Sequence, residues 1–167
     1  LRKAIELKPD FAEAHNNMGD VLLNLGELQD AELSYRKAIE LDPDLTEAHC
    51  NLGNILRDLR KLQDAEIYTR KAIELNPNFA EAYSNLGGIY RELGKLKEAE
   101  IYTRKAIELN PKFANAYSNL GIILYELGIL KEAEMYTRKA IKVNPNFAKA
   151  YYSLSKIEQL TSEKNWE

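Results

Sequence analysis

Apolar residues recur along this chain at the spacing of amphipathic helices, and the stretch from Phe79 shows the pattern most clearly. In FAEAYSNLGGIYREL the apolar positions follow one another at steps of three and four residues, and LKEAEIYTRKAIEL, from Leu96, repeats that spacing. A stripe of this period predicts a helix with one buried face. Gly94 separates the two segments, and the second ends at Asn110-Pro111, because proline disfavours helical geometry in the residue before it. The two segments predict a helical hairpin.

The hairpin is repeated with a fixed period. The five prolines are 34 residues apart and stand at Pro9, Pro43, Pro77, Pro111 and Pro145. Four complete copies are expected at 12–45, 46–79, 80–113 and 114–147, and the last two are identical at 25 of 34 positions. Residues 1–11 resemble the end of a second helix and predict the remnant of an upstream repeat. Residues 148–161 predict a capping helix, and 162–167, with Trp166, a tail.

Small residues recur inside the helices of every copy. Glycine costs about 1 kcal/mol relative to alanine within a helix, yet each first helix contains one near its middle. We therefore expect the two helices of a hairpin to approach too closely for a side chain at Gly19, Gly53, Gly87 and Gly121. Asn78 and Glu81 have the spacing of a capping box. Arg60 stands where the other turns have glycine, so a left-handed backbone is expected there.

Composition and charge limit the kinds of partner and the location that we expect. The chain has a net charge of −3, and its regularly spaced Arg-Lys pairs each have acidic residues nearby, so we expect no nucleic-acid partner. No apolar run approaches the roughly 18 residues of a membrane span, so no membrane partner is expected. Cys50 is the single cysteine, which excludes an internal disulfide and fits a reducing compartment, so the expected location is cytoplasmic.

The 34-residue period, the Leu-Gly pair of the first helices (Leu52-Gly53, for example), the paired alanines of the second helices and the closing proline resemble the tetratricopeptide repeat family. This resemblance implies an all-α fold, a right-handed α–α superhelix (a solenoid) of four full hairpins plus a terminal helix, with the first helices lining a concave groove. Thr69, Thr103 and Thr137 depart from the family, which usually has an aromatic residue there, and the tyrosine stands one place earlier.

The groove implied by the resemblance contains one column of asparagines. A carboxamide offers both a donor and an acceptor, so such a column can pair with the backbone of an extended peptide. The sequence AYSNLG also resembles the repeats of protein O-GlcNAc transferase, whose asparagine ladder holds extended polypeptide. The expected peptide-binding residues are Asn16, Asn17, Asp20, Asn51, Asn54, Asn85, Asn119 and Glu126. The alternative is that asparagine is only a tolerated polar residue that recent duplication has retained.

Other features of the inner positions bear on the ligand. The carboxylate clamp of the family's chaperone-binding members is absent, because Asn16, Cys50 and Ser84 stand where its lysine would be sought. The inner charges change from acidic in the first copies to basic at Lys149 and Lys156, which favours a ligand with basic residues toward the N-terminal end of the array.

No catalytic set is predicted. His15 and His49 occupy a column that other copies fill with tyrosine, so a packing role for a flat ring explains both. As a metal pair they fail, because equivalent positions on packed helices are roughly 8–10 Å apart and metal–ligand bonds are near 2 Å. We therefore expect a non-catalytic protein-interaction scaffold that binds peptide and needs no metal or cofactor. The alternatives are a structural module that self-associates end to end through an exposed N-terminal repeat, and the substrate-recruiting arm of a larger transferase.

Overall fold

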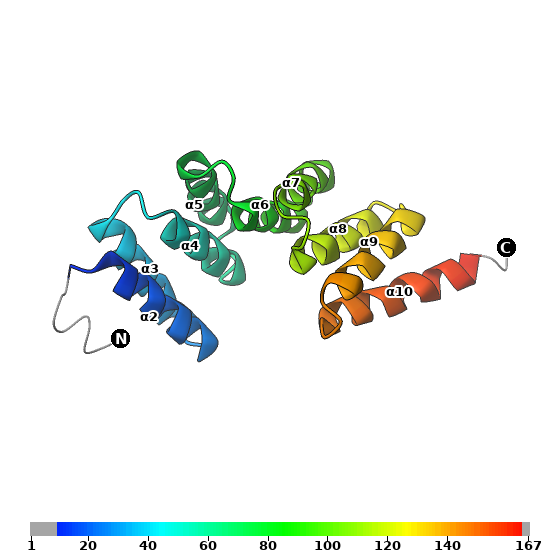
Figure 1. Cartoon of the computed structure of the whole chain (residues 1–167), viewed down its shortest axis with the longest axis horizontal. Helices are drawn as coiled ribbons and strands as arrows, with labels where there is room; N and C mark the ends of the chain where they lie inside the picture. Colours follow the sequence, from blue (N-terminus) through cyan, green and yellow to red (C-terminus); the bar gives the residue numbers. More distant parts are fainter. Residues whose placement is uncertain (1–9, 165–167) are drawn as a thin grey trace. The chain divides into compact units, whose positions relative to one another are not determined.

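The structure is a computed structural model, and it describes residues 10–164 of the chain. They form nine α-helices and no strand (Figure 1), so the all-α hairpin array is confirmed. The first helices of the hairpins are α2 (Ala12–Asn24), α4 (Thr46–Asp58), α6 (Ala80–Glu92), α8 (Ala114–Glu126) and α10 (Ala148–Lys164). The second helices are α3 (Leu28–Leu41), α5 (Leu62–Leu75), α7 (Leu96–Leu109) and α9 (Leu130–Val143). None of these helices is both long and apolar enough to cross a membrane.

The chain divides into two compact units, one up to Asn85 and one from Leu86. In the first unit, α2 packs against α3 and α4 against α5, while α3 also packs against the following α4. In the second unit, α8 packs against α9, and both of these helices contact α10 (Figure 1). Helices α4 and α8 are therefore each held by their own hairpin partner and by the second helix of the hairpin before them, since α8 also packs against α7. This is the packing of a repeat array, in which neighbouring units share one core.

The mid-helix glycines lie where the two helices of a hairpin meet, as expected. A Cβ added at Gly53 would collide with the hydroxyl of Thr69 and lie 3.2 Å from the carbonyl oxygen of Ala65. Gly87 and Gly121 face Thr103 and Thr137 in the same way. The glycines are thus required by packing, and a buried threonine fills the space opposite each of them.

The turns within the hairpins use the left-handed backbone conformation. Gly26, Gly94 and Gly128 have φ of 79°, 75° and 78°, and nothing lies within 4 Å of a Cβ built on any of them. Arg60 occupies the equivalent turn with φ of 63°. The left-handed site expected at Arg60 is confirmed, and its side chain makes that conformation costly.

The capping box expected at Asn78 and Glu81 is wrong. Helix α6 begins at Ala80, so the residue directly before it is Phe79 and not Asn78. Leu45 is in the same position before α4 and makes no side-chain cap. The reason is that the loop is organised around the proline: Asn76 Oδ1 accepts a hydrogen bond of 3.0 Å from the backbone N–H of Asn78. Asp42, Asn110 and Asn144 make the same bond across their prolines. The polar side chain therefore stabilises the end of the preceding helix and the loop.

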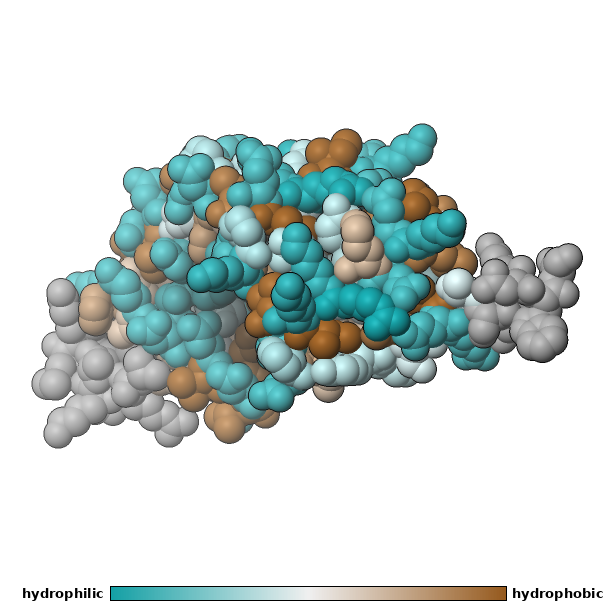
Figure 2. Space-filling model, turned by 45° about the vertical axis from the view of Figure 1, so that its right-hand side comes forward, coloured by the Kyte–Doolittle hydropathy of each residue, from teal (hydrophilic) through white to brown (hydrophobic). Residues whose placement is uncertain are grey.

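Arginines of the second helices join successive hairpins. Arg36 pairs with Glu32 one turn earlier at 2.9 Å, and its Nη1 donates to the hydroxyl of Tyr68 in the next second helix at 3.0 Å. Arg104 makes the same contact with Tyr136 at 2.8 Å. On the face shown in Figure 2, hydrophilic residues cover most of the surface and apolar residues appear between them. The arginines thus pair with nearby acidic residues, as their spacing indicated, and they also link repeats.

The ends of the chain differ in part from expectation. The capping helix expected over 148–161 continues to Lys164, because residues 162–164 contain no glycine or proline and the Thr161 hydroxyl donates to the carbonyl of Ile157 at 2.9 Å. Most of the upstream remnant expected over 1–11 lies outside the described residues. The end of the expected tail, including Trp166, also lies outside them.

Candidate functional site

The asparagine column of the first helices is positioned by hydrogen bonds that reach back to the preceding hairpin. Asn51 Nδ2, on α4, donates to Oδ1 of Asn16 at 3.1 Å and to Oδ1 of Asp20 at 3.2 Å, both on α2. Asn85 Nδ2, on α6, donates to Sγ of Cys50 at 3.3 Å. In both cases the carboxamide contacts the residue 35 positions earlier. The column therefore connects neighbouring first helices.

These bonds leave one side of each carboxamide available. Asn51 and Asn85 are partly exposed, and within the described part of the chain their Oδ1 atoms accept no hydrogen bond. Asn17, the first member of the column, is exposed, and Asn54 is partly exposed one turn beyond Asn51. The first unit thus presents fixed carbonyl acceptors on the surface of its first helices.

Asn16 and Asp20 hold Asn51 in place by accepting its hydrogen bonds. Asn16 is buried, with 8% of its surface exposed, and acts as an acceptor for Asn51. Asp20 accepts from Asn51 and also from the hydroxyl of Tyr35 at 2.8 Å. Burial, and then the hydrogen bond with Asp20, raise the pKa of Tyr35 above its ordinary value, so its hydroxyl remains a donor. Two of the expected ligand contacts therefore already have partners within the fold.

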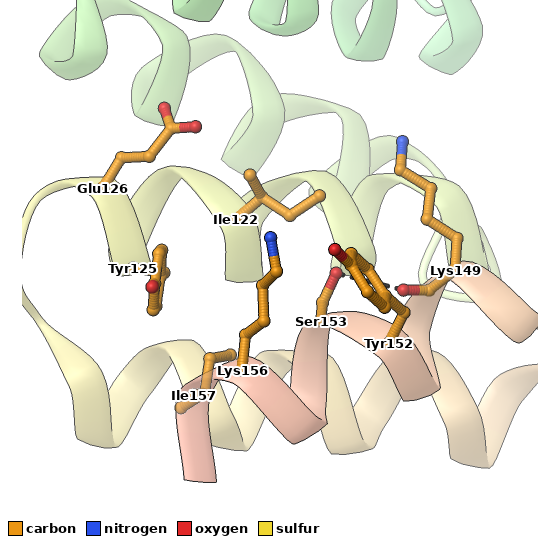
Figure 3. A pocket seen from close by; sticks show the side chains of 8 residues that line it. All are labelled: Ile122, Tyr125, Glu126, Lys149, Tyr152, Ser153, Lys156 and Ile157. Atoms are coloured by element: carbon orange, nitrogen blue, oxygen red, sulfur yellow. Dashed lines mark hydrogen bonds between the residues drawn. The ribbon is translucent and has the colours of Figure 1, made fainter. Parts of the chain in front are cut away.

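In the second unit, Asn119 and Glu126 lie on α8. Asn119 is partly exposed and Glu126 is exposed. Glu126 is on the rim of a pocket of about 220 Å³ between α8 and α10 (Figure 3). The pocket is lined by Ile122, Tyr125, Glu126, Lys149, Tyr152, Ser153, Lys156 and Ile157. Of the expected peptide-binding residues, only Glu126 lines it.

The histidine and cysteine of α4 are packing residues. His49 is buried, its ring stacks on Tyr68 with centroids 5.9 Å apart, and Nε2 lies 2.8 Å from the carbonyl of Pro43. Tyr117 is in the equivalent position, and its hydroxyl donates to the carbonyl of Pro111 at 3.3 Å. Burial raises the pKa of Cys50 to about 12, so the thiol is protonated at neutral pH. The described residues include no cluster of three or more His, Cys, Asp or Glu that could hold a metal ion.

The repeats match a known family. The profile of the tetratricopeptide repeat matches residues 12–45, 46–79, 80–113 and 114–147. The chain belongs to the tetratricopeptide repeat family. No curated protein matches the sequence as a relative.

Several solved structures are similar to this chain. MamA is 30% identical, with a TM-score of 0.72, over 89% of this chain and 86% of that one. YrrB, described as a tetratricopeptide protein with an unusual peptide-binding site, is 27% identical with a TM-score of 0.69, over 96% and 83%. The first tetratricopeptide domain of Spaghetti, bound to the HSP90 peptide SRMEEVD, is 26% identical with a TM-score of 0.66, over 70% and 93%.

The departure of this tetratricopeptide chain from its family has a structural reason. In the first repeat, the Tyr35 ring lies across Gly19. In the later repeats a threonine takes that place, and the tyrosine one position earlier points to the neighbouring hairpin, as Tyr68 does toward Arg36. Moving the ring by one residue rotates it by about 100° around the helix. The tyrosine thereby adds a contact between hairpins, as Tyr68 does with Arg36, to its contact within its own hairpin, the stack of Tyr68 on His49.

Sequence reasoning missed most of the pocket between α8 and α10. It named Glu126 as a peptide contact and noted the charges of Lys149 and Lys156, but it gave no role to Tyr125, Tyr152 or Ser153. A signal was present, because each of these three differs from the residues at the same position of the other repeats. The signal could not be recognised without knowing that the positions surround one hollow.

Proposed function

We propose that this tetratricopeptide chain is a non-catalytic scaffold that binds extended peptide segments along its first helices, with the asparagine column pairing with the peptide backbone. The observation that carries the proposal is the state of Asn51 and Asn85, whose N–H groups are held by the preceding hairpin while their Oδ1 atoms remain available on the surface. An acceptor fixed in advance binds a peptide N–H with little loss of side-chain entropy.

The spacing of the column suits an extended ligand. Neighbouring packed helices are roughly 8–10 Å apart, and an extended chain advances about 3.3 Å per residue. Successive asparagines would therefore meet about every third residue of the peptide. Because such pairing uses the peptide backbone, the proposed site selects extended conformation more than side-chain identity, as in the asparagine ladder of O-GlcNAc transferase.

Two relatives support a peptide ligand, since YrrB is described by its peptide-binding site and the Spaghetti domain was solved with an HSP90 peptide. The mode that we propose differs from a lysine clamp for a terminal carboxylate. Asn16, Cys50 and Ser84, where the clamp lysine would be sought, are buried to 8%, 3% and 2% exposure. We also propose a cytoplasmic location, which fits the reduced, buried Cys50 and which cell fractionation would check.

The test begins with a phage-displayed library of random twelve-residue peptides, from which the best binder is synthesised with a fluorescent label. We expect Asn51→Ala/Asn85→Ala to weaken its binding at least tenfold by fluorescence anisotropy, with helicity retained in circular dichroism. Gln29→Ala/Gln63→Ala is the matched control, because both glutamines are exposed on second helices.

A second arm tests the backbone directly. N-methylation of every third peptide residue, in the three possible registers, should abolish binding in at least one register, whereas scrambling the side chains should change affinity by less than about threefold. Equal affinity of the asparagine variant and the parent chain would refute the ladder and favour a purely inter-repeat role for the column.

Self-association is a second candidate, favoured by one observation. Each second helix exposes one apolar side chain at the same position of the repeat: Leu33, Ile67, Ile101 and Met135, with exposures of 64%, 63%, 65% and 52%. Exposed apolar groups promote association. Light scattering at millimolar concentration tests it: a strict monomer excludes this candidate, and an oligomer that is lost when all four become serine supports it.

A further inference from the structure

The pocket between α8 and α10 has an apolar interior and charged ends. Ile122 and Tyr125 come from α8, and Tyr152 and Ile157 come from α10 (Figure 3). Lys156 extends between the two helices toward Ile122, while Lys149 and Glu126 lie at opposite ends of the view. Pockets for drug-sized ligands measure about 300–1,000 Å³, so a volume of about 220 Å³ fits a single large side chain better than a whole small molecule.

The residues that line this pocket are departures from the repeat. Ile122 replaces the Asp, Asn and Gly found at residues 20, 54 and 88, and Tyr125 replaces the Leu, Arg and Arg of residues 23, 57 and 91. On α10, Tyr152 stands where other repeats have small or polar residues, and Lys149 where three of them have glutamate. A helix that only caps the array requires polar substitutions on α10. It does not explain apolar and aromatic substitutions on α8, which belongs to a complete repeat.

The asparagine column stops at Ser153, which lines the hollow. In earlier hairpins the asparagine reaches the residue 35 positions before it, which for Ser153 is Ser118. The Ser153 hydroxyl instead donates to the carbonyl of Lys149 at 3.0 Å (Figure 3). Ser118 is fully buried, and its hydroxyl oxygen has no hydrogen-bond partner in the described part of the chain. The serine side chain is shorter than a carboxamide and does not make the contact between first helices that Asn51 and Asn85 make.

Two lysines and one glutamate line this space, so its net charge is positive. Lys149 and Lys156 are two turns apart on α10, a rise of about 10.5 Å, and both line the pocket. Lys156 Nζ lies 4.7 Å from the centroid of the Tyr152 ring. A hydrogen bond with the Tyr152 hydroxyl raises the pKa of Lys156, which keeps it cationic at neutral pH. An anionic group between these two lysines would be attracted to both of them.

We propose that this pocket receives a large apolar side chain of a bound peptide, and that a carboxylate next to that side chain pairs with Lys156 and Lys149. This inference rests on the proposed peptide-binding function and specifies part of its ligand. Where the asparagine column selects backbone conformation, the pocket supplies a preference for one sequence feature, an acidic residue beside an aromatic or large aliphatic one.

The test uses defined peptides and the ¹⁵N-labelled full chain in NMR titrations. The probe is the acetylated, amidated octapeptide Gly-Ser-Gly-Phe-Glu-Gly-Ser-Gly, with versions in which Phe becomes Ala or Glu becomes Gln or Lys. A fifth peptide, acetyl-Gly-Ser-Gly-Phe with a free terminal carboxylate, distinguishes a main-chain carboxylate from a side-chain one. We expect amide shifts at Ile122 and Tyr152 with the parent peptide, and no saturable shifts with the Ala version.

Charge exchange tests the role of the lysines. The Glu→Gln peptide should bind about three- to fivefold more weakly, as an exposed ion pair predicts, and the Glu→Lys peptide at least tenfold more weakly. Lys156→Glu should reverse this order, while Lys142→Glu, on an exposed position of α9, should leave it unchanged. Equal affinity for the Glu, Gln and Lys peptides would overturn the proposal.

The outcome is separable from that of the proposed function. Binding of the library-selected peptide through Asn51 and Asn85, with no shifts at the pocket for any octapeptide, would refute the pocket alone. Loss of both would refute the peptide-binding function itself. Filling the pocket with Ser153→Leu should remove the octapeptide shifts, and persistence of those shifts would also count against the pocket.

Discussion

Oε2 of Glu32 accepts a hydrogen bond of 2.7 Å from Nζ of Lys61, 29 residues later and immediately before α5. Glu32 Oε1 accepts a second bond from Arg36, one turn later on α3. The carboxylate side chain is only 10% exposed, whereas those of Lys61 and Arg36 are 48% and 39% exposed. A buried carboxylate thus ties the first hairpin to the turn of the second.

This ion pair predicts a pH-dependent loss of stability. Burial raises the pKa of Glu32, but hydrogen bonds from Lys61 and Arg36 outweigh it, so the pKa lies below its ordinary value of 4.5. The contribution of Glu32 is therefore fully present above about pH 4.5 and is lost as the pH falls through the lower folded-state pKa. Glu32→Gln should reduce the free energy of unfolding by about 1 kcal/mol at pH 7.

Urea denaturation at pH 7 and at pH 3 checks this prediction. The difference between Glu32→Gln and the parent chain should shrink at pH 3. Glu74→Gln is the control, because Glu74 is 68% exposed and pairs with Lys71 at 3.4 Å. A pH-independent difference would show that shape, and not charge, decides the effect of Glu32→Gln.

Arg60→Gly should stabilise the fold. Arg60 has φ of 63°, in a turn where the equivalent residues are glycines. A side chain in the left-handed conformation costs roughly 1–2 kcal/mol, and the greater freedom of glycine in the unfolded chain offsets part of that. We expect a net gain of about 0.5–1 kcal/mol and a rise in melting temperature of roughly 1–4 °C. Gly94→Arg should lower the melting temperature by a similar amount, and a fall for Arg60→Gly would contradict the strain.

Gly53→Ala should destabilise the fold, although alanine has a higher helix propensity than glycine. The new methyl group would collide with the Thr69 hydroxyl and press on the carbonyl of Ala65. Overpacking of this kind costs about 1–3 kcal/mol. Adding Thr69→Ala removes the hydroxyl but leaves the carbonyl contact, so the double variant should recover part of the lost unfolding free energy. A double-mutant cycle without coupling between the two positions would refute the contact.

Ser153→Asn should extend the asparagine column by one hairpin. A carboxamide at this position can donate to the buried hydroxyl of Ser118, which lacks a partner among the described residues. One such hydrogen bond contributes about 0.5–1.5 kcal/mol, measured as an increase in the urea midpoint. Ser153→Leu adds a side chain of similar size without a donor and is the control. Equal midpoints for both variants would show that filling the hollow, and not the hydrogen bond, matters.

The helices could be predicted from the sequence because the signals for them are local. The apolar stripe, the turn residues and the Asn-Pro ends each act within one or two turns of helix, and the left-handed site at Arg60 follows by comparison with Gly26 and Gly94. The capping box failed for a related reason. Asn76 and Asn78 are both suitable local acceptors, and the loop uses the first of them. Sequence spacing alone does not decide between two such residues.

The candidate site was less predictable because its contacts run between hairpins. The sequence places Asn51 in the asparagine column. Its bonds to Asn16 and Asp20 depend on how α2 and α4 pack. The exchange of Tyr35 for Thr69 and Tyr68 depends in the same way on the neighbouring Arg36. Periodicity shows which positions are equivalent. It does not show what each position touches in the next unit.

The 35-residue step of the asparagine bonds has a consequence for the history of the chain. Because Asn51 and Asn85 each find a partner the same distance back, the joint between hairpins is a repeated part and not a unique one. A duplicated 34-residue segment would pack against neighbouring hairpins that have the same contact positions. Such a molecule can grow or shrink by whole units, so the length of its asparagine column is set by the number of repeats that the gene encodes.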